Sequence, residues 1–320
     1  MTKRIISPSP HLHSGNRSDR LMLAVALALL PALATGVWFF GIRALMLTLT
    51  AVTTCMVTEY ITQRFMLKQP PTLSDGSAIV TGVIFSLNLP SNLPLWIVII
   101  GAFVSIAIGK MSFGGLGRNI FNPALVGRVF LLISFPVQMT AWPLPEQGFM
   151  IVDGETGATL LSALKHNPEL HPDLIPLLTG NLGGSLGETG AVALLIGALF
   201  LLFRRVITWH IPVSIIVSAF ITSALFHWID PAHNIPPHYH LLVGGLLLGA
   251  IFMATDYVTS PMTPTGMLLY GCGIGIITIL IRTFGAYPEG ISFAILIMNA
   301  LTPLINHYVK PRYFGGGKKQ

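Results

Sequence analysis

A threonine flanked by small residues is the first candidate for chemistry, as a site of covalent attachment. The stretch around it contains Asp153, Thr156, Gly157, Ala158 and Thr159. Small neighbours leave the Thr159 hydroxyl approachable by the active site of another protein, which a modification target requires. On composition alone the alternative is favoured: an ordinary turn in which Thr159 caps the helix that follows.

A second candidate is the segment 109–124, where glycines, amides and cations lie between two apolar runs. Its polar side chains include Lys110, Arg118, Asn119 and Asn122. Irregular backbone at membrane depth is tolerated only where it lines a cavity or contacts protein. Backbone amides together with cations could bind an anionic or polar heterocycle here. A simple cytoplasmic loop is the equal alternative.

Two acids lie in apolar surroundings and are candidates for ion coupling. Glu59 falls inside an apolar run, where a carboxylate is costly unless it faces a polar interior. It also lies near Arg64 and could snorkel or pair there. Asp256 follows a short apolar run beside a proline break, where it could bind a cation or a flavin N–H. The alternative role of Asp256 is to cap a helix end.

The composition places all of these residues in an integral membrane protein. Only 9% of the 320 residues are charged and the mean hydropathy is +0.73, whereas a soluble domain has about 25% charged residues. The two cysteines, Cys55 and Cys272, exclude a disulfide framework and an iron–sulfur site supplied by this chain alone. We expect no metal site either, because the histidines around the loop at 227–240 fit no known ligand spacing.

Ten apolar runs predict an all-α, polytopic fold. Six have the length of ordinary membrane helices: Leu21–Gly41, Ala44–Ile61, Thr189–Phe203, Ile211–Ile229, Gly266–Ile281 and Ile291–Ile305. Four are shorter or interrupted: Ala78–Leu89, Leu95–Ile108, Ala124–Val137 and Leu241–Ala254. We expect a single membrane domain over residues 1–320, with terminal segments at 1–20 and 306–320 and a long loop at 140–188.

The distribution of cations predicts the orientation of these spans. If the N-terminus is inside and the spans alternate, fourteen Lys and Arg residues fall inside and three outside, with Arg128 left within a span. Because cations accumulate on the cytoplasmic side of short loops, both termini are predicted to be cytoplasmic and the loop at 140–188 to face outward. The basicity therefore reflects membrane topology, and we expect no nucleic acid partner.

The two halves of the chain resemble each other weakly. In each half a short glycine-rich run ends at a proline break before a full crossing: Gly82–Pro90 precedes the run to Lys110, and Gly249–Pro261 precedes the run to Arg282. Paired interrupted helices are typical of a repeat-built membrane core with its site near the midplane. The alternative is that glycine and proline are simply common in membrane helices.

Several separated motifs together resemble the NqrB/RnfD family, almost from end to end. They are 113–119 (FGGLGRN), 121–124 (FNPA), 132–140 (LISFPVQMT), 156–159 (TGAT), 255–259 (TDYVT) and 285–290 (GAYPEG). The short N-terminus and compact outer loop look more like the D subunit of the Rnf complex than like the longer B subunit of the sodium-translocating NADH:quinone reductase. The run 181–188 (NLGGSLGE) also looks like a family motif, and could present amides to a flavin or its phosphate.

The resemblance implies FMN attached to Thr159 through a phosphoester bond, installed by a flavin transferase on the outer face. Thr156 stands where serine is commoner in the family, and it keeps the hydroxyl. The family also implies an inner-membrane complex made of the A, B, C, D, E and G subunits of Rnf, in which electrons pass between ferredoxin and NAD and drive Na⁺ or H⁺ across the membrane. A second, non-covalent flavin such as riboflavin is a further expectation.

Two other functions are alternatives. One is the quinone-reductase B subunit, and the other is a flavin-free channel or solute transporter, since a core with broken helices serves transport equally well.

Overall fold

The computed structural model describes residues 18–145, 156–157, 159–166, 172, 174–180, 183–188, 190–231, 233–285 and 289–310. Asp153 and Ala158 lie outside these residues. The described chain is mostly helical, and its two strands have two residues each, which confirms the predicted all-α fold.

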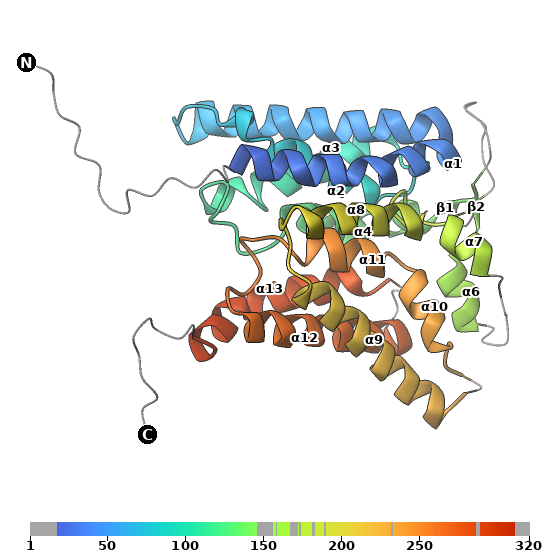
Figure 1. Ribbon diagram of the computed structural model, residues 1–320. Helices are drawn as coiled ribbons and strands as arrows, with labels where there is room; N and C mark the ends of the chain where they lie inside the picture. Colours follow the sequence, from blue (N-terminus) through green and yellow to red (C-terminus); the bar gives the residue numbers. More distant parts are fainter. Residues whose placement is uncertain are drawn as a thin grey trace, which may run out of the picture.

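Thirteen α-helices form the described part of the molecule (Figure 1). Their bounds are α1 Ser18–Ile61, α2 Ser77–Leu87, α3 Leu95–Ala107, α4 Pro123–Ser134, α5 Pro136–Thr140, α6 Leu160–His166, α7 Leu174–Thr179, α8 Ala191–Phe203, α9 His210–Ile229, α10 Pro237–Leu242, α11 Leu246–Leu248, α12 Pro264–Phe284 and α13 Ile291–Tyr308. Two π-helical segments, η1 Thr62–Met66 and η4 Gly249–Met253, continue α1 and α11. Two 3₁₀ segments are η2 Leu73–Asp75 and η3 Met111–Phe113. Strands β1 Trp142–Pro143 and β2 Thr156–Gly157 pair antiparallel.

Helix α1 consists of two antiparallel arms that meet at Gly41 (Figure 1). Gly41 has φ 66° and ψ −154°, a conformation that a side chain would strain. The arms correspond to the predicted spans Leu21–Gly41 and Ala44–Ile61. Together with α2, α3, α4, α8, α9, α11–η4, α12 and α13 they account for the ten predicted segments. The start of α1 and the end of α13 lie at the same end of the bundle (Figure 1), as an even number of crossings requires.

Two predicted runs are divided differently from our expectation. The run Leu241–Ala254 is not one helix, because α10 ends at Leu242 and α11 begins only after Gly244 and Gly245, which have φ of 80° and 65°. The run Ala124–Val137 ends as a helix at Ser134, because Pro136 excludes helical backbone from Phe135. Both divisions follow from local backbone chemistry that hydropathy alone does not register.

The two interrupted helices are arranged as an inverted pair. Each begins after a left-handed glycine, α2 after Gly76 and α11 after Gly245. Their C-terminal ends meet, since the Asn88 amide nitrogen at the end of α2 lies 3.8 Å from the Met253 sulfur at the end of η4. Two broken helices that meet in this way are consistent with the predicted internal repeat.

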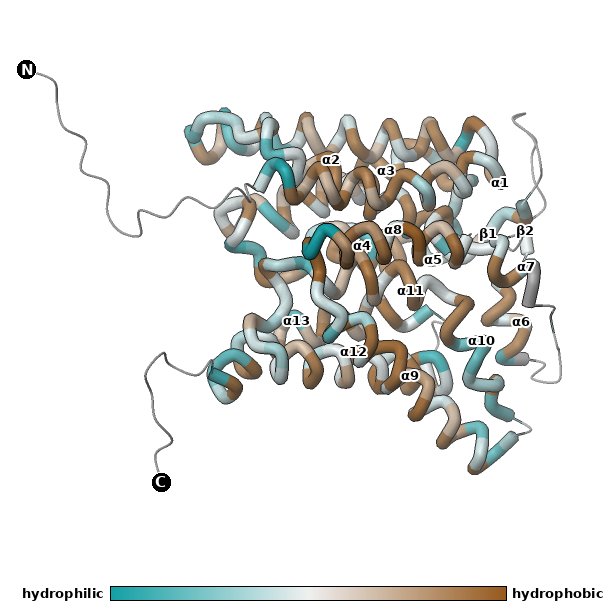
Figure 2. Tube along the Cα trace, viewed as in Figure 1, coloured by the Kyte–Doolittle hydropathy of each residue, from teal (hydrophilic) through white to brown (hydrophobic). Residues whose placement is uncertain are grey.

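Small residues allow the longer helices to pack closely in both halves. Helix α4 packs on α3 so closely that a Cβ at Gly127 would collide with the Ser105 hydroxyl. In the same way, α12 packs on α9 so closely that a Cβ at Gly271 would collide with the Ser214 hydroxyl. Close approach of small residues is a general basis of helix association in lipid. Hydrophobic residues predominate along the helices, and hydrophilic residues collect toward their ends (Figure 2). Five helical segments of the described chain are long and apolar enough to cross a membrane.

Candidate functional site

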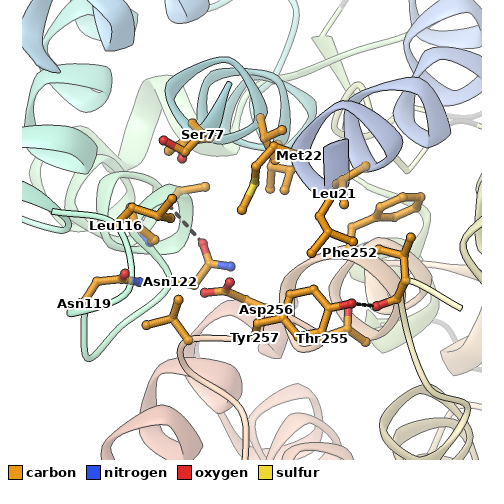
Figure 3. A pocket seen from close by; sticks show the side chains of 18 of the residues that line it. Leu21, Met22, Ser77, Leu116, Asn119, Asn122, Phe252, Thr255, Asp256 and Tyr257 are labelled. Carbon is orange, nitrogen blue, oxygen red and sulfur yellow. Dashed lines mark hydrogen bonds between the residues drawn. The ribbon is translucent and has the colours of Figure 1, made fainter. Parts of the chain in front are cut away.

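A cavity opens at the end of the bundle where α1 starts (Figure 3). Its walls come from both halves of the chain: Leu21 and Met22 from α1, Ser77 from α2, the loop before α4, and residues 251–258. Figure 3 shows Asn119, Asn122 and Asp256 around a common space, with Leu21, Met22 and Tyr257 on the apolar side. A mostly apolar cavity with a few convergent polar groups is typical of a site for a small molecule or cofactor.

Asn122 joins the two halves of the cavity. Its side-chain oxygen accepts a hydrogen bond from the Ala124 amide at 3.1 Å and so caps the start of α4, where Pro123 occupies the first helical position. Its amide nitrogen donates to the Met253 carbonyl at 3.1 Å, which satisfies a backbone acceptor at the end of η4. One buried side chain therefore fixes the start of one helix against the end of another.

Asp256 is the acid of the cavity, and donors surround it. Its carboxylate accepts from the Thr259 hydroxyl at 3.2 Å, from the Val258 amide and from the Asn119 side chain. Burial raises the pKa of the Asp256 carboxyl, and these hydrogen bonds oppose that rise. The sequence placed Asn119, Asn122 and Asp256 in two separate candidate segments, and the structure brings them together.

Glu59 forms a buried ion pair with Lys110 rather than with Arg64. The Lys110 ammonium lies 2.7 Å from the Glu59 carboxylate and donates to the Ser77 hydroxyl at 2.6 Å. The Gln63 amide also donates to Glu59, at 3.3 Å. Lys110, which the sequence indicated as an anion ligand, lines the cavity with its charge already paired. A full charge pair in this position explains how an acid and a base are tolerated within apolar helices.

Arg118 lies apart from this cavity, although it belongs to the same predicted segment. Its side chain is exposed and lines a neighbouring hollow on the other side of Asn119. The four polar residues predicted in 109–124 therefore divide into an ion-paired lysine, two amides in the cavity and one exposed arginine.

Thr159 lies at the opposite end of the bundle, beside β2 and α6 (Figure 1). Its hydroxyl accepts from the Ser162 amide at 3.2 Å, so Thr159 is the N-cap of α6, the role that composition alone predicted. The side chain is 3% exposed. Helix α6 is held in a small separate core whose members are Leu161, Leu164, Leu177, Ile235, Tyr239 and Val243. In this conformation the Thr159 hydroxyl is therefore covered.

Two buried arginines in the core were not assigned any role from the sequence. Arg128 of α4 forms an ion pair with Glu289 and donates to the Asn88 side-chain oxygen at 3.0 Å and to the Ser292 hydroxyl at 2.6 Å. Arg282 of α12 donates to the carbonyls of residues 240, 243 and 244 at 2.6, 3.0 and 2.7 Å. A charge inside an apolar run was the available signal for Arg128, whereas Arg282 follows the last residue of its predicted run.

Two backbone amides of the glycine-rich run before α8 donate hydrogen bonds to backbone carbonyls at the end of α2. The Gly187 and Leu186 amides donate to the carbonyls of Leu87 and Leu89 at 2.7 and 3.2 Å. A Cβ at Gly187 would come within 2.9 Å of the Leu87 oxygen and 2.7 Å of the Leu248 side chain. These two amides complete the end of α2 instead of presenting themselves to a phosphate.

Comparison with known proteins identifies the family of this chain. A model of the NQR2, RnfD, RnfE family matches residues 5–315. The chain belongs to the NQR2, RnfD, RnfE family. It is 42% identical over 322 residues to the D subunit of the proton-translocating ferredoxin:NAD(+) oxidoreductase complex of Clostridium ljungdahlii, covering 97% of this chain and 96% of the relative.

Two further relatives of this family member carry different descriptions. The D subunit of the Na(+)-translocating ferredoxin:NAD(+) oxidoreductase complex of Acetobacterium woodii is 42% identical over 313 residues, covering 97% of this chain and 95% of that one. The D subunit of the ion-translocating oxidoreductase complex of Stutzerimonas stutzeri is 40% identical, covering 93% and 92%. The relative named for proton translocation and the relative named for Na⁺ translocation are equally identical to this chain. Sequence identity therefore does not indicate which ion is translocated.

The family member shows no clustered metal ligands among its described residues. His233, in the histidine-rich loop after α9, pairs with the Asp230 carboxylate at 2.9 Å.

Proposed function

We propose that this chain is the D subunit of an Rnf-type complex that transfers electrons between ferredoxin and NAD and couples the transfer to ion translocation. The observation that carries the proposal is the match along nearly the whole chain to relatives named as D subunits of such complexes. The proposal assigns one flavin to each end of the core, with Thr159 at one end and the cavity around Asn119 at the other. We expect the chain to be inactive without its partner subunits.

The first flavin of this proposal is FMN attached to the Thr159 oxygen. The attachment is a phosphoester bond, which leaves the isoalloxazine ring free to accept and donate electrons. Gly157 has no side chain that could block the approach to Thr159, and its backbone pairs with that of Trp142. Since the Thr159 hydroxyl is covered and caps α6, the transferase would act on a conformation in which the start of α6 has separated from the small core around it.

The second flavin is a non-covalent one, such as riboflavin, in the cavity near Asn119. The residues present fit a flavin ring in their chemistry: Asn119 and Asn122 offer amide groups, and Leu21, Met22 and Tyr257 provide apolar walls. Asp256 would orient Asn119 through their hydrogen bond and present an acceptor to a ring N–H.

Asp256 and Glu59 are the proposed ion-coupling acids. Glu59 contacts the cavity indirectly, through Lys110 and Ser77, which both line it. A change of charge on a ligand in the cavity would act on Lys110 directly and on Glu59 through the ion pair. This connection relates the redox state of a flavin to the protonation or ion occupancy of a buried carboxylate.

The proposed setting is the bacterial inner membrane, with both termini cytoplasmic and Thr159 on the outer side. The partners are the A, B, C, E and G subunits of the Rnf complex, the flavin transferase that matures the chain, and membrane lipid. Eight of the twelve described Lys and Arg residues belong to the end where α1 starts, at 20, 64, 68, 110, 118, 204, 205 and 310, which supports this orientation.

The test is the intact mass and the in-gel flavin fluorescence of the denatured chain, coexpressed with its transferase, beside Thr159→Val. Thr140→Val is the control, because Thr140 is an exposed threonine near the same sheet whose hydroxyl bonds only its own helix turn. Covalent flavin in the wild type and the control, and none in Thr159→Val, is the expected result. A flavin-free wild-type chain would contradict the relay and favour a channel built on the meeting half-helices. Quinone dependence with the corresponding partners would instead indicate the quinone-reductase B subunit.

A further inference from the structure

A second cavity, of about 240 Å³, lies beside the first at the same end of the bundle. Three segments form it: the loop at 117–120, residues 258–259, and the last turns of α13 from Asn299 to Asn306. Asn119 and Val258 line both cavities and separate them. Neither the family relationship nor the proposed flavin sites assign an occupant to it.

The floor of this cavity contains a buried hydrogen-bond donor without an acceptor. Asn299 is 1% exposed, and no group in the described part of the chain accepts from its amide nitrogen. Its oxygen accepts from the Tyr270 hydroxyl at 2.5 Å, and Tyr270 is itself fully buried. Turning the amide around would leave the Tyr270 proton without an acceptor, so the nitrogen faces away from Tyr270. Buried donors of this kind are normally satisfied, so the Asn299 nitrogen needs an acceptor that the described residues do not supply.

The rim adds further donors and a positive charge. The Arg118 guanidinium is exposed at the cavity, and within the described residues it has no carboxylate partner. Asn306 uses its side-chain oxygen to accept from the Met262 amide at 3.2 Å, which leaves its nitrogen free to donate. The nearest acid, Asp256, is held by Thr259 and Asn119 and lines the other cavity. The lining therefore has an excess of N–H donors and one unpaired cation.

We propose that this cavity binds a phosphate group. Three N–H-bearing side chains around a hollow, one of them a guanidinium, match the several acceptor oxygens and the charge of a phosphate mono- or diester. The cavity lies at the end of the bundle where the cationic segments collect, which is where the phosphates of a membrane lie, and basic pockets between membrane helices bind phospholipid headgroups. Exposed Ile120 and Pro303 at its edge suit the glycerol end of such a lipid. A phospholipid and free inorganic phosphate share the recognised chemistry and are separated by the experiment.

The experiment uses the full chain in its purified complex, delipidated in detergent. Binding of dioctanoyl phosphatidylglycerol and of inorganic phosphate is measured by calorimetry for the wild type, Arg118→Gln and Asn299→Asp. The aspartate keeps an acceptor for Tyr270 and replaces the free donor by an oxygen, and thermal unfolding of this variant checks that the fold is retained. Arg64→Gln is the control, because Arg64 is an exposed cation at the same end that does not line the cavity.

We expect each cavity variant to weaken binding about tenfold or more, as the loss of a charge-assisted hydrogen bond implies, and the control to bind as the wild type does. Binding of the lipid alone identifies a headgroup as the source, and binding of both probes identifies a general phosphate site. Equal affinity in wild type and both cavity variants overturns the proposal, as does a complex that binds neither probe because a partner subunit fills the cavity. Neither result bears on whether Thr159 carries flavin.

Discussion

The Lys110 ammonium and the Glu59 carboxylate lie 2.7 Å apart, with side chains only 2% and 0% exposed. The pair joins the second arm of α1 to the segment after α3, and through Ser77 it also touches the start of α2. Three elements that are separate in the sequence thus share one buried ion pair beside the cavity.

Glu59→Gln should therefore destabilise the protein by about 3–5 kcal/mol, because it leaves a buried ammonium without its counter-charge. The combined variant Glu59→Met with Lys110→Met should recover most of that stability, since apolar residues of similar volume commonly replace a buried pair at little cost. Thermal unfolding of the detergent-solubilised chain measures both. If the double variant is as unstable as the single one, the pair is not what holds these elements together. If it is stable but the complex no longer translocates ions, Glu59 has the proposed coupling role as well.

Replacing Arg282 should have a large effect at the opposite end. Its guanidinium satisfies three backbone carbonyls where the chain breaks between α10 and α11, and hydrogen bonds to charged groups contribute about 1.5–3 kcal/mol each. We expect Arg282→Met to lower stability by about 3 kcal/mol or more and to increase proteolysis near Gly244. Arg64→Met serves as the comparison, because Arg64 is an exposed arginine at the end of the second arm of α1. Equal stability of the two variants would contradict the capping role.

The two hydrogen bonds of Asn122 can be separated by substitution. Asn122→Ser keeps a good helix cap but is too short to reach the Met253 carbonyl, whereas Asn122→Ala loses both functions. We expect a loss of about 1 kcal/mol for serine and about 2 kcal/mol for alanine. Non-covalent flavin content should fall in both variants. Retention of full flavin content by the alanine variant would indicate that the cavity does not depend on Asn122.

Acidification should lower the stability of the region around α10, because His240 becomes protonated. Burial, followed by the charge of Arg282, lowers the pKa of His240 to about 3 from its ordinary 6.5. The folded state thus binds fewer protons than the unfolded state between these values, so stability is complete above about pH 6.5 and declines as the pH falls toward 3. Amide hydrogen exchange in α10, compared at about pH 7.5 and about pH 5 after correction for intrinsic rates, should show this loss.

The control for this measurement is a pair of histidine variants. His240→Phe cannot be protonated and should reduce the pH dependence, while His238→Phe, at an exposed position of the same helix, should leave it unchanged. A pH dependence that persists in His240→Phe would assign it to another group.

Weakening the small separate core that holds α6 should accelerate flavin attachment. Because Thr159 is covered while α6 is docked, opening is a required step before transfer under the proposed function. Leu164→Ala removes a fully buried side chain of that core, and we expect the transferase to modify this variant several-fold faster. Leu131→Ala, equally buried but in the main core, should show the wild-type rate. A slower rate in Leu164→Ala would mean that the docked helix is the form the enzyme recognises.

Hydropathy and charge were sufficient to predict the ten segments, because membrane spans must be apolar over a fixed length and cations mark one side. The weak internal repeat was predicted from the glycine-rich runs that end at proline breaks. The points that failed are local. The break before α11 depends on two glycines with positive φ, and a hydropathy window averages over them.

The candidate site was predicted less completely, because its residues come together only through tertiary packing. Asn122 was identified from its motif, but its bond to Met253 crosses between the two halves. Glu59 had a nearby cation in the sequence, Arg64, and the structure pairs it with one 51 positions away. Sequence proximity is a weak guide to buried partners when antiparallel helices bring distant residues together.

The links between the halves also constrain the order in which this protein can be made. The end of α2 lacks its last backbone partners until Gly187 has been synthesised, and Arg128 lacks Glu289 and Ser292 until the chain is nearly complete. A nascent first half therefore enters the membrane with an unneutralised arginine and open carbonyls. It must be protected by the insertion machinery, by water or by lipid phosphates until translation delivers the second half.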